Sequence, residues 1–286
     1  MRHSVELKDP GYGKSRVRLV KVERCGSRHD VRDINVDIEL FGAFEAAYWE
    51  GDNRHILPTD SMKNTIYAFA RRETIGEIEE FGLQLANHFL LSNSYVCRVQ
   101  VVISENIWQR IKCHGEPHDH AFQRSGPEHR TAVIERSRNQ TSIKAVIKDL
   151  VILKTAQSAF ENFLRDEYTT LKDTHDRLFG TTVKAEWSYR KQARDFGKVW
   201  SGVRTTLLDV FATHNSRSVQ HTLYAMGEAV LQRFDSIYEI RLSMPNQHCL
   251  LLDLSPFNLD NPNMVFVPTD EPSGLIEATL TRSVSW

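Results

Sequence analysis

The chain has 286 residues, of which 41% are hydrophobic and 26% are charged. This length and balance fit one large or two ordinary globular domains and exclude a disordered chain. Thirty-six Lys and Arg against 37 Asp and Glu leave a formal net charge of -1, which gives no general field for nucleic acid or an anionic membrane. We therefore expect any anion to be bound by a local site.

The two ends of the chain and its cysteines indicate the expected cellular location of the protein. The segment Met1–Lys8 lacks the apolar core of a secretory signal, and no stretch has the length needed to span a bilayer. The chain ends in Ser283-Val284-Ser285-Trp286, which differs from the small-basic-leucine peroxisomal address. The four cysteines are scattered along the chain, which favours reduced thiols over a disulfide framework. They are Cys25, Cys97, Cys113 and Cys249. We therefore expect a cytoplasmic protein without membrane association.

Hydrophobic periodicity predicts one order of elements twice. The first half reads as strands around Val17–Leu19 and at Ile34–Leu40, helices from Asp60 or Ser61 and from about Thr74 to Phe89, and strands at Tyr95–Ile103 and from Ile107. The second half reads as strands at Thr131–Arg136, Ile143–Lys154 and Val183–Tyr189, helices at Val199–Thr213 and Ser218–Phe234, and strands at Ser236–Leu242 and His248–Leu254. Asp60 or Ser61 is the expected N-cap of the first helix, and Ser218 that of the last.

Two strand pairs that flank a helix pair, present twice, predict a duplicated α+β unit. Its antiparallel sheets should have one face covered by helices. We place the first unit at residues 1–130 and the second at 131–286. The free edges of such sheets are often closed by association into a barrel, so we expect an oligomer.

Two long polar segments stand out, Pro58–Thr65 and Leu164–Arg177. Both are dense in hydroxyls, carboxylates and bases, which core packing does not explain. Together with shorter motifs in the same order along the chain, they resemble the urate oxidase (uricase) family from Tyr12 to Ile276. The shorter motifs are Tyr12-Gly13-Lys14, Ser158–Phe163, Asp176-Arg177-Leu178, Ser218-Val219-Gln220 and Pro245-Asn246-Gln247-His248.

The resemblance implies a fold, an assembly and a reaction. Urate oxidases are homotetramers of tandem tunnelling-fold (T-fold) domains that close into a barrel, with their sites at subunit interfaces. They oxidise urate with O2 and water to 5-hydroxyisourate and hydrogen peroxide. No metal or organic cofactor takes part, because the electron-rich urate anion supplies the redox chemistry and the protein positions it and moves its protons.

Three residues of the first half match the family's catalytic positions. The resemblance implies that Lys14 is the catalytic base-relay lysine, that Thr59 is coupled to it and contacts urate, and that Asp60 is a further substrate contact. A lysine accepts protons usefully only if its pKa is lowered. Taken alone, Lys14 reads as an exposed lysine at the start of a strand, and Thr59-Asp60 as a helix N-cap.

Phe160 and Arg177 match the residues that hold the urate ring. An aromatic face suits a flat purine, and a guanidinium fork suits an anionic edge with adjacent acceptors. Without the family, Phe160 reads as a core residue beside Phe163 and Leu164, and Arg177 as a solvated surface residue.

Four residues late in the chain match the rest of the family's site. The resemblance implies that the Val219 backbone N–H and the Gln220 amide complete urate recognition. A glutamine offers both donor and acceptor to a heterocycle edge. Asn246 matches the asparagine beside the oxygen or water site, and His248 the histidine of the proton relay. The ordinary alternatives are first-turn helix positions, an asparagine in a hairpin turn and a structural histidine.

A competing hypothesis starts from the segment His114–His120 after Cys113. Its histidines and carboxylates are typical of a zinc or non-haem iron site, which would favour a metal-dependent hydrolase or a cyclohydrolase of related fold. The resemblance weakens it, because urate oxidases carry a similar segment without needing a metal. A third class, a non-catalytic purine-binding or scaffold protein, is disfavoured because every matched position is filled.

Overall fold

The computed structural model describes residues 5–190 and 193–282. The chain divides into two compact units, Met1–Val146 and Ile147–Trp286, whereas the sequence placed the boundary at 130/131. The residues 283–286, on which the expectation about a peroxisomal address rests, lie outside the described residues, as do residues 1–4. In the part that is described, no helix combines the length and the apolar character that crossing a membrane requires.

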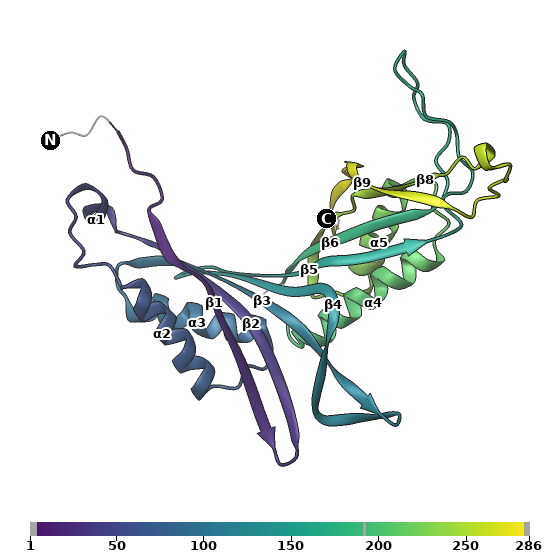
Figure 1. The fold of residues 1–286 in the computed structure, drawn as a ribbon. Coiled ribbons are helices and arrows are strands. Elements are labelled where there is room, and N and C mark those ends of the chain that lie inside the picture. The colour runs from purple at the N-terminus through teal and green to yellow at the C-terminus, as the bar shows by residue number, and fades with distance from the viewer. Residues whose placement is uncertain (1–4, 191–192, 283–286) are drawn as a thin grey trace. The chain divides into compact units, whose positions relative to one another are not determined.

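The first unit is an antiparallel sheet with helices on one face. Its strands follow each other in the order β1-β2-β3-β4, while α2 contacts β1 and α3 contacts β3 and β4. Figure 1 shows α2 and α3 together on one side of these strands. The elements are β1 (Gly11–Cys25), β2 (Arg28–Gly42), α1 (Glu45–Trp49), α2 (Thr59–Arg72), α3 (Ile78–Ser92), β3 (Val96–Cys113) and β4 (Glu116–Ser137).

The core of this unit lies between the sheet and its helices. The strand β2 alternates, so that its apolar residues are buried while Asp37 and Glu39 point to the other face. Burying a side chain of this size stabilises the fold by about 1.5–3 kcal/mol, which fixes the strand's register. The buried set includes Ile34, Val36, Ile38 and Leu40 of β2, Met62 and Ile66 of α2, and Phe81, Leu85 and Phe89 of α3.

The second unit repeats this arrangement. Its sheet has the order β5-β6-β7-β10, with β8 paired to β6 and β9. The helix α5 contacts β7, β10 and α4, and the ring centroids of Phe179 on β6 and Phe211 on α4 lie 5.1 Å apart. The elements are β5 (Thr141–Lys154), β6 (Phe179–Tyr189), α4 (Phe196–Thr213), α5 (Val219–Arg233), β7 (Ile237–Ser243), β8 (Asn246–Leu251), η1 (Ser255–Phe257), β9 (Phe266–Gly274) and β10 (Glu277–Thr281).

The α+β class, the antiparallel sheets and the duplicated order of elements are confirmed. The expectation of two strands at 95–111 was wrong, because β3 is continuous. Within β3, Glu105 forms an ion pair of 2.6 Å with Arg32 of the neighbouring strand β2. The sequence also missed α1, η1, β9 and β10. Closure into a barrel stays a prediction.

Two helix starts also differ from expectation. Neither Asp60 nor Ser61 caps α2: its N-cap is Pro58, which makes no side-chain cap bond, and Thr59 is the first helical residue. The second helix, α3, begins at Ile78 rather than near Thr74. Ser218 is the N-cap of α5, as the sequence predicted, and its hydroxyl accepts from the His221 N–H at 3.1 Å.

Candidate active site

Lys14 lies on β1 directly before a bulge. It pairs with Ile38, but Val17 is the next residue in register, with Val36, so β1 carries one extra residue. Arg16 takes a positive φ of 57° at this point, and its N–H donates to Asp37 at 2.5 Å. The extra residue lets Lys14 before the bulge and Val17 after it point to the same, helix-covered face.

The start of α2 lies near Lys14. Thr59 is half-buried there, and Asp60 accepts hydrogen bonds from Lys63 and from the Asn64 amide, the latter at 2.9 Å. The pKa of Asp60 is lowered, chiefly by the hydrogen bond from Lys63 and in smaller part by the charge of Lys14. Lys14 and Asp60 are therefore within electrostatic reach of each other.

A hydroxyl that sequence reasoning missed ties these two segments together. The Leu57 N–H donates to the Tyr12 hydroxyl oxygen at 2.7 Å. Tyr12 precedes Lys14 on β1, and Leu57 precedes Thr59 in the segment that leads into α2. The triplet Tyr12-Gly13-Lys14 was recognised in the sequence, but no sequence pattern indicated that Leu57 would bond the Tyr12 hydroxyl.

In the second unit, backbone hydrogen bonds join three segments that are far apart in the chain. The Ala159 N–H donates to Ser216 O at 2.8 Å, and the Arg177 N–H donates to Ser158 O at 2.8 Å. Phe160 exchanges two backbone bonds with Thr174, of 2.8 and 3.0 Å. Phe160, Arg177 and the segment before Val219 are thereby held around one junction.

Arg177 lies against the ring of Phe160. Its guanidinium carbon is 5.2 Å from the ring centroid, within range of a cation–π contact. The pKa of Arg177 is lowered, and burial is the single cause. A half-buried guanidinium with no carboxylate acting on it within the described residues is suited to an anionic ligand.

The first turn of α5 presents Val219 and Gln220. Val219 is buried, whereas Gln220 is exposed. The Ser218 cap engages the amide of His221. The first amides of a helix have no intrahelical acceptor, so those of Val219 and Gln220 can donate to an anion or a polar ring edge.

A half-buried lysine, which no sequence pattern indicated, contacts the segment that leads into α5. The ammonium of Lys154, on β5, donates to His214 O at 2.6 Å. Burial lowers the pKa of Lys154, while Asp176 acts in the opposite direction. The His214 ring contacts the buried Thr222 hydroxyl at 3.2 Å. Together these contacts fix the segment that ends at the Ser218 cap.

Asn246 and His248 lie at the start of β8. Asn246 opens this strand, is buried and pairs with Thr181 of β6, so it does not lie in the hairpin turn. Its amide nitrogen is 3.3 Å from Nδ1 of His248. Gln247, between them, donates to the Thr182 hydroxyl at 3.0 Å. The structure thus brings these two predicted residues together.

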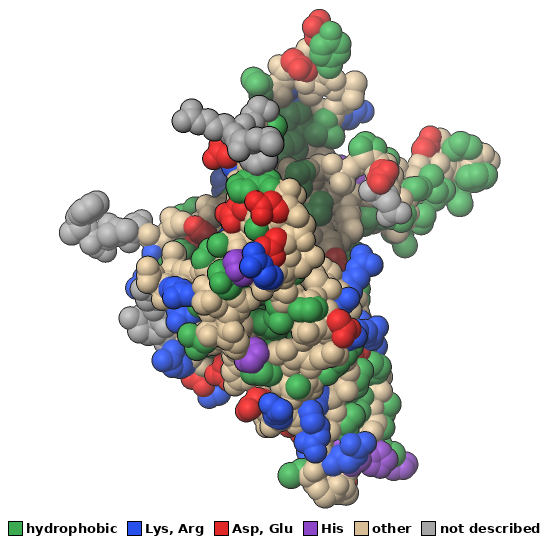
Figure 2. Space-filling view, turned by 90° about the vertical axis from the view of Figure 1, so that its left-hand side faces the viewer, with side chains coloured by type: hydrophobic (Ala, Val, Ile, Leu, Met, Phe, Trp, Pro, Cys, Tyr) green, Lys and Arg blue, Asp and Glu red, His purple; other side chains and the backbone are tan. Residues whose placement is uncertain are grey.

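The histidine-rich segment belongs to the β3–β4 hairpin. Arg110 joins it to the β1–β2 hairpin, since it donates to His118 O and Asp119 O at 3.2 and 2.7 Å and to Asp30. Figure 2 shows histidine side chains beside Lys and Arg side chains on the surface. Across residues 5–190 and 193–282, no group of three His, Cys, Asp or Glu is arranged to hold a metal ion. The metal-dependent alternative therefore has no support.

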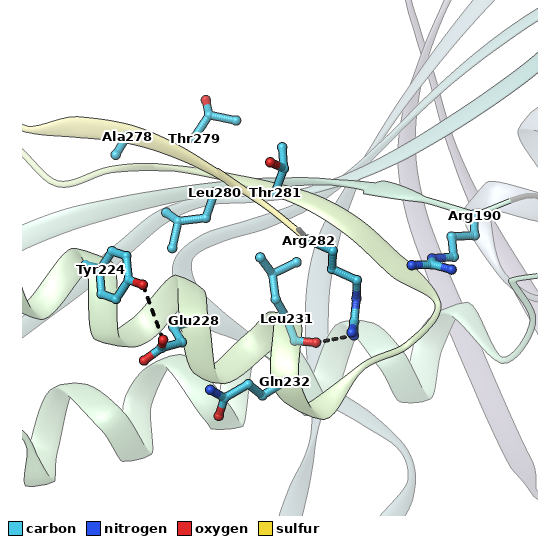
Figure 3. Close-up of a pocket in the computed structure, with 10 residues that line it drawn as sticks. All are labelled: Arg190, Tyr224, Glu228, Leu231, Gln232, Ala278, Thr279, Leu280, Thr281 and Arg282. Carbon is cyan, nitrogen blue, oxygen red and sulfur yellow. Dashed lines mark hydrogen bonds between the residues drawn. The ribbon is translucent and has the colours of Figure 1, made fainter. Parts of the chain in front are cut away.

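A hollow of about 660 Å³ lies between α5 and β10. Figure 3 shows that Arg282 reaches from the end of β10 to the backbone of α5, where it donates to Leu231 O. It also donates to Phe234 O at 3.1 Å. None of the residues predicted for the site lines this hollow, and the Arg282 guanidinium is occupied by the backbone carbonyls of Leu231 and Phe234.

Comparison with known proteins identifies a family. The family model described as Uricase matches residues 11–135 and 143–277. The uricase of Arthrobacter globiformis is 46% identical over 274 residues, which cover 96% of this chain and 89% of that protein. The uricase of Dictyostelium discoideum is 42% identical over 282 residues, 98% of each chain.

Solved structures agree. The crystal structure of the Arthrobacter globiformis uricase superimposes with a TM-score of 0.95 at 45% identity, and it covers 99% of this chain and 97% of that one. A urate oxidase from Bacillus sp. TB-90 has a TM-score of 0.84 at 23% identity, with 96% and 100% covered. At that identity, the second likeness supports the fold alone.

Proposed function

The chain belongs to the uricase family, and from that premise we propose that it oxidises urate with O2 and water, using one residue cluster from each unit. The first unit contributes Lys14, Thr59 and Asp60. The second unit contributes Phe160, Arg177, Val219, Gln220, Asn246 and His248. The residues proposed to be catalytic are Lys14, Thr59 and His248, and the others, together with Thr59, are proposed to bind the substrate. The observation that carries the proposal is the half-buried Arg177, whose guanidinium carbon lies 5.2 Å from the centroid of the Phe160 ring.

The reaction balances without a further reductant or oxidant. Urate loses two electrons and O2 gains them, and together with two protons O2 becomes hydrogen peroxide. The oxygen of water forms a new C–O bond at the oxidised ring carbon, and the product is 5-hydroxyisourate. The protein's tasks are to hold the urate anion, to remove a proton from it and to place O2 and then water against the ring.

The second unit supplies the grip on urate. Phe160 offers its ring face to the flat purine, while Arg177 donates two parallel N–H groups to the anionic edge. The Val219 N–H and the Gln220 amide address the opposite edge. Their place in the first turn of α5 supports this role, because amides there have no helix acceptor and favour negative charge.

Lys14 and Thr59 handle the protons. A threonine hydroxyl both donates and accepts, so Thr59 passes a proton between urate, or a bound water, and the Lys14 amine. The position of Lys14 near the α2 start supports this pairing, as does its electrostatic effect on Asp60. Asp60 supplies a further polar contact to the substrate.

Asn246 and His248 serve the oxygen side of the site. The Asn246 amide holds O2 or the attacking water, and His248 continues the proton relay. Their mutual distance of 3.3 Å supports a joint role, since one side chain orients the other. The pair of tautomers open to His248 lets it both accept and donate.

The assembly we propose is a homotetramer with sites at subunit interfaces. The matched residues are divided between the two compact units. In the described structure, β1 and β10 each pair with one neighbouring strand, and unpaired strand edges favour association. Leu164 and Tyr168 are 95% and 81% exposed, which also suits burial against another subunit. We expect the sheets to close into a barrel there.

The test is a stoichiometry on chelator-treated protein shown to be metal-free. Urate loss is followed by ultraviolet absorbance while O2 uptake and peroxide release are measured in the same sample. We expect one O2 consumed and one peroxide formed for each urate. Turnover that returns only when a metal is restored would instead favour a metal-dependent enzyme. Urate loss without O2 uptake would exclude the oxidase.

A further inference from the structure

One hydrogen bond joins β1 to the segment 51–58. Its donor is the Leu57 N–H and its acceptor is the Tyr12 hydroxyl, 2.7 Å away. The other hydrogen bonds of this segment, among the described residues, stay within it or reach α1 and α2. They include Ile56 N–H to Asn53 O at 3.0 Å and Asp52 N–H to Ala46 O at 3.2 Å. The Tyr12 hydroxyl is thus the hydrogen-bonded anchor of the segment on β1.

The Tyr12 ring is itself held firmly. It meets the buried ring of Phe44 edge to face, with centroids 4.9 Å apart, and it packs against the core of the first unit. Its strand partner is the fully buried Leu40. Burial raises the pKa of Tyr12, so the phenol keeps its proton and presents a neutral oxygen to the Leu57 N–H.

The two ends of this bond lead directly to Lys14 and Thr59. Tyr12 and Lys14 are two positions apart on β1, so their side chains point to the same face. Leu57 stands two positions before Thr59, the first residue of α2. A shift of Leu57 relative to β1 would therefore move the Thr59 hydroxyl relative to the Lys14 amine.

We propose that Tyr12 is a positioning residue, whose hydroxyl sets the distance between Lys14 and Thr59 by anchoring Leu57 to β1. This inference rests on the proposed function of Lys14 and Thr59. Proton transfer needs donor and acceptor within hydrogen-bond reach, and an error of about 1 Å in such a site can cost on the order of 100-fold in rate. Phe160 and Arg177, which we propose bind urate, do not depend on this hydrogen bond.

The test variant is Tyr12→Phe, which keeps the ring and its packing and removes one acceptor. We expect kcat to fall roughly ten- to hundredfold while KM for urate stays within about threefold. Hydrogen–deuterium exchange of the 51–58 segment, followed by mass spectrometry, should become faster. The thermal midpoint, measured in parallel, shows that the variant is folded.

Tyr48→Phe is the matched control. The Tyr48 hydroxyl donates to Gly11 O at 2.9 Å, so this variant also loses one phenol bond to β1 but leaves the Leu57 anchor intact. It should keep wild-type kcat. An equal loss in both variants would assign the effect to β1 packing and overturn the inference. Normal kcat in Tyr12→Phe would overturn it as well, with or without faster exchange.

These outcomes are separable from failure of the proposed function. If the wild type does not oxidise urate, the function itself is wrong. If the wild type is active, Lys14→Met is inactive and Tyr12→Phe is normal, the function stands and the positioning role falls.

Discussion

The guanidinium carbon of Arg177 lies 5.2 Å from the centroid of the Phe160 ring. The two residues come from different segments, which the bond from the Arg177 N–H to Ser158 O holds together at 2.8 Å. An aromatic ring suits the face of a flat anion, and a guanidinium suits the acceptors on its edge. If Phe160 and Arg177 bind the substrate and Lys14 transfers protons, changes at these positions should affect KM and kcat separately.

Replacing Arg177 with Gln should weaken urate binding first. We expect KM to rise by roughly 10- to 100-fold with a smaller change in kcat, because a charge-assisted bidentate contact is lost. Steady-state kinetics over a wide urate range measures this. Arg165→Gln is the matched control, since Arg165 lies 4.5 Å over Phe163 in the same region but is exposed. Unchanged KM in Arg177→Gln would refute the proposed grip.

Lys14→Met should leave folding and urate binding largely intact and lower kcat by several orders of magnitude. The methionine keeps much of the side-chain volume but cannot accept or donate a proton. Single-turnover urate consumption is the measurement. Lys21→Met, on the same strand, removes a partly buried ammonium that bonds Glu73 O at the end of α2 and should retain turnover. If Lys14→Met turns over normally, the residue has no place in the mechanism.

Ser218→Ala should reduce both stability and affinity. Loss of an N-cap costs about 1 kcal/mol, and here the cap orients the helix turn that presents Val219 and Gln220. We expect a lower thermal midpoint and a several-fold higher KM. Ser201→Ala, which removes an exposed hydroxyl bonded to Lys198 O, should change neither. A Ser218 variant with unaltered KM would show that the first turn of α5 does not depend on its cap.

The buried ion cluster of the first unit predicts a pH dependence of stability. Arg130 contacts Glu79 at 2.6 Å and Glu77 at 2.5 Å, and Glu79 is fully buried. Burial raises the pKa of Glu79, while Arg130 opposes the rise. Removing Arg130 would leave an uncompensated buried carboxylate, which typically costs about 3–5 kcal/mol.

The sign follows from the raised pKa of Glu79. A carboxyl whose folded pKa exceeds its unfolded value favours the folded state below the unfolded pKa, and that stabilisation is lost as pH rises through the folded pKa. Arg130→Met should therefore approach wild-type stability in acid and fall behind as pH rises towards neutrality. Thermal midpoints across pH measure this, and a gap independent of pH would contradict it.

Features set by local sequence could be predicted. The β2 core face follows from strict alternation at Ile34–Leu40, and the Ser218 cap follows from a serine before a helical pattern. The predicted N-cap of α2, Asp60 or Ser61, was wrong because Pro58 occupies the N-cap position. The φ of proline is fixed near the helical value, and Thr59 is the first residue of the helix.

Features that depend on distant partners could not be predicted. The bond between Tyr12 and Leu57 spans 45 positions, and the contact of Lys154 with His214 spans 60. No local sequence pattern around Tyr12 or Lys154 indicates which distant residue it will contact. The junction of Phe160, Arg177 and Ser216 likewise arises from loop backbones, which have no hydrophobic period.

The most direct measurement is subunit complementation. Lys14→Met and Arg177→Gln chains are unfolded, mixed in equal amounts and refolded, and turnover is assayed at urate concentrations far below the KM of the Arg177 variant. If each site takes Lys14 and Arg177 from different subunits, about one quarter of the sites in a random mixture regain both residues, and activity should approach that share of refolded wild type. A mixture no more active than the average of the two variants refolded alone would contradict a site shared between subunits.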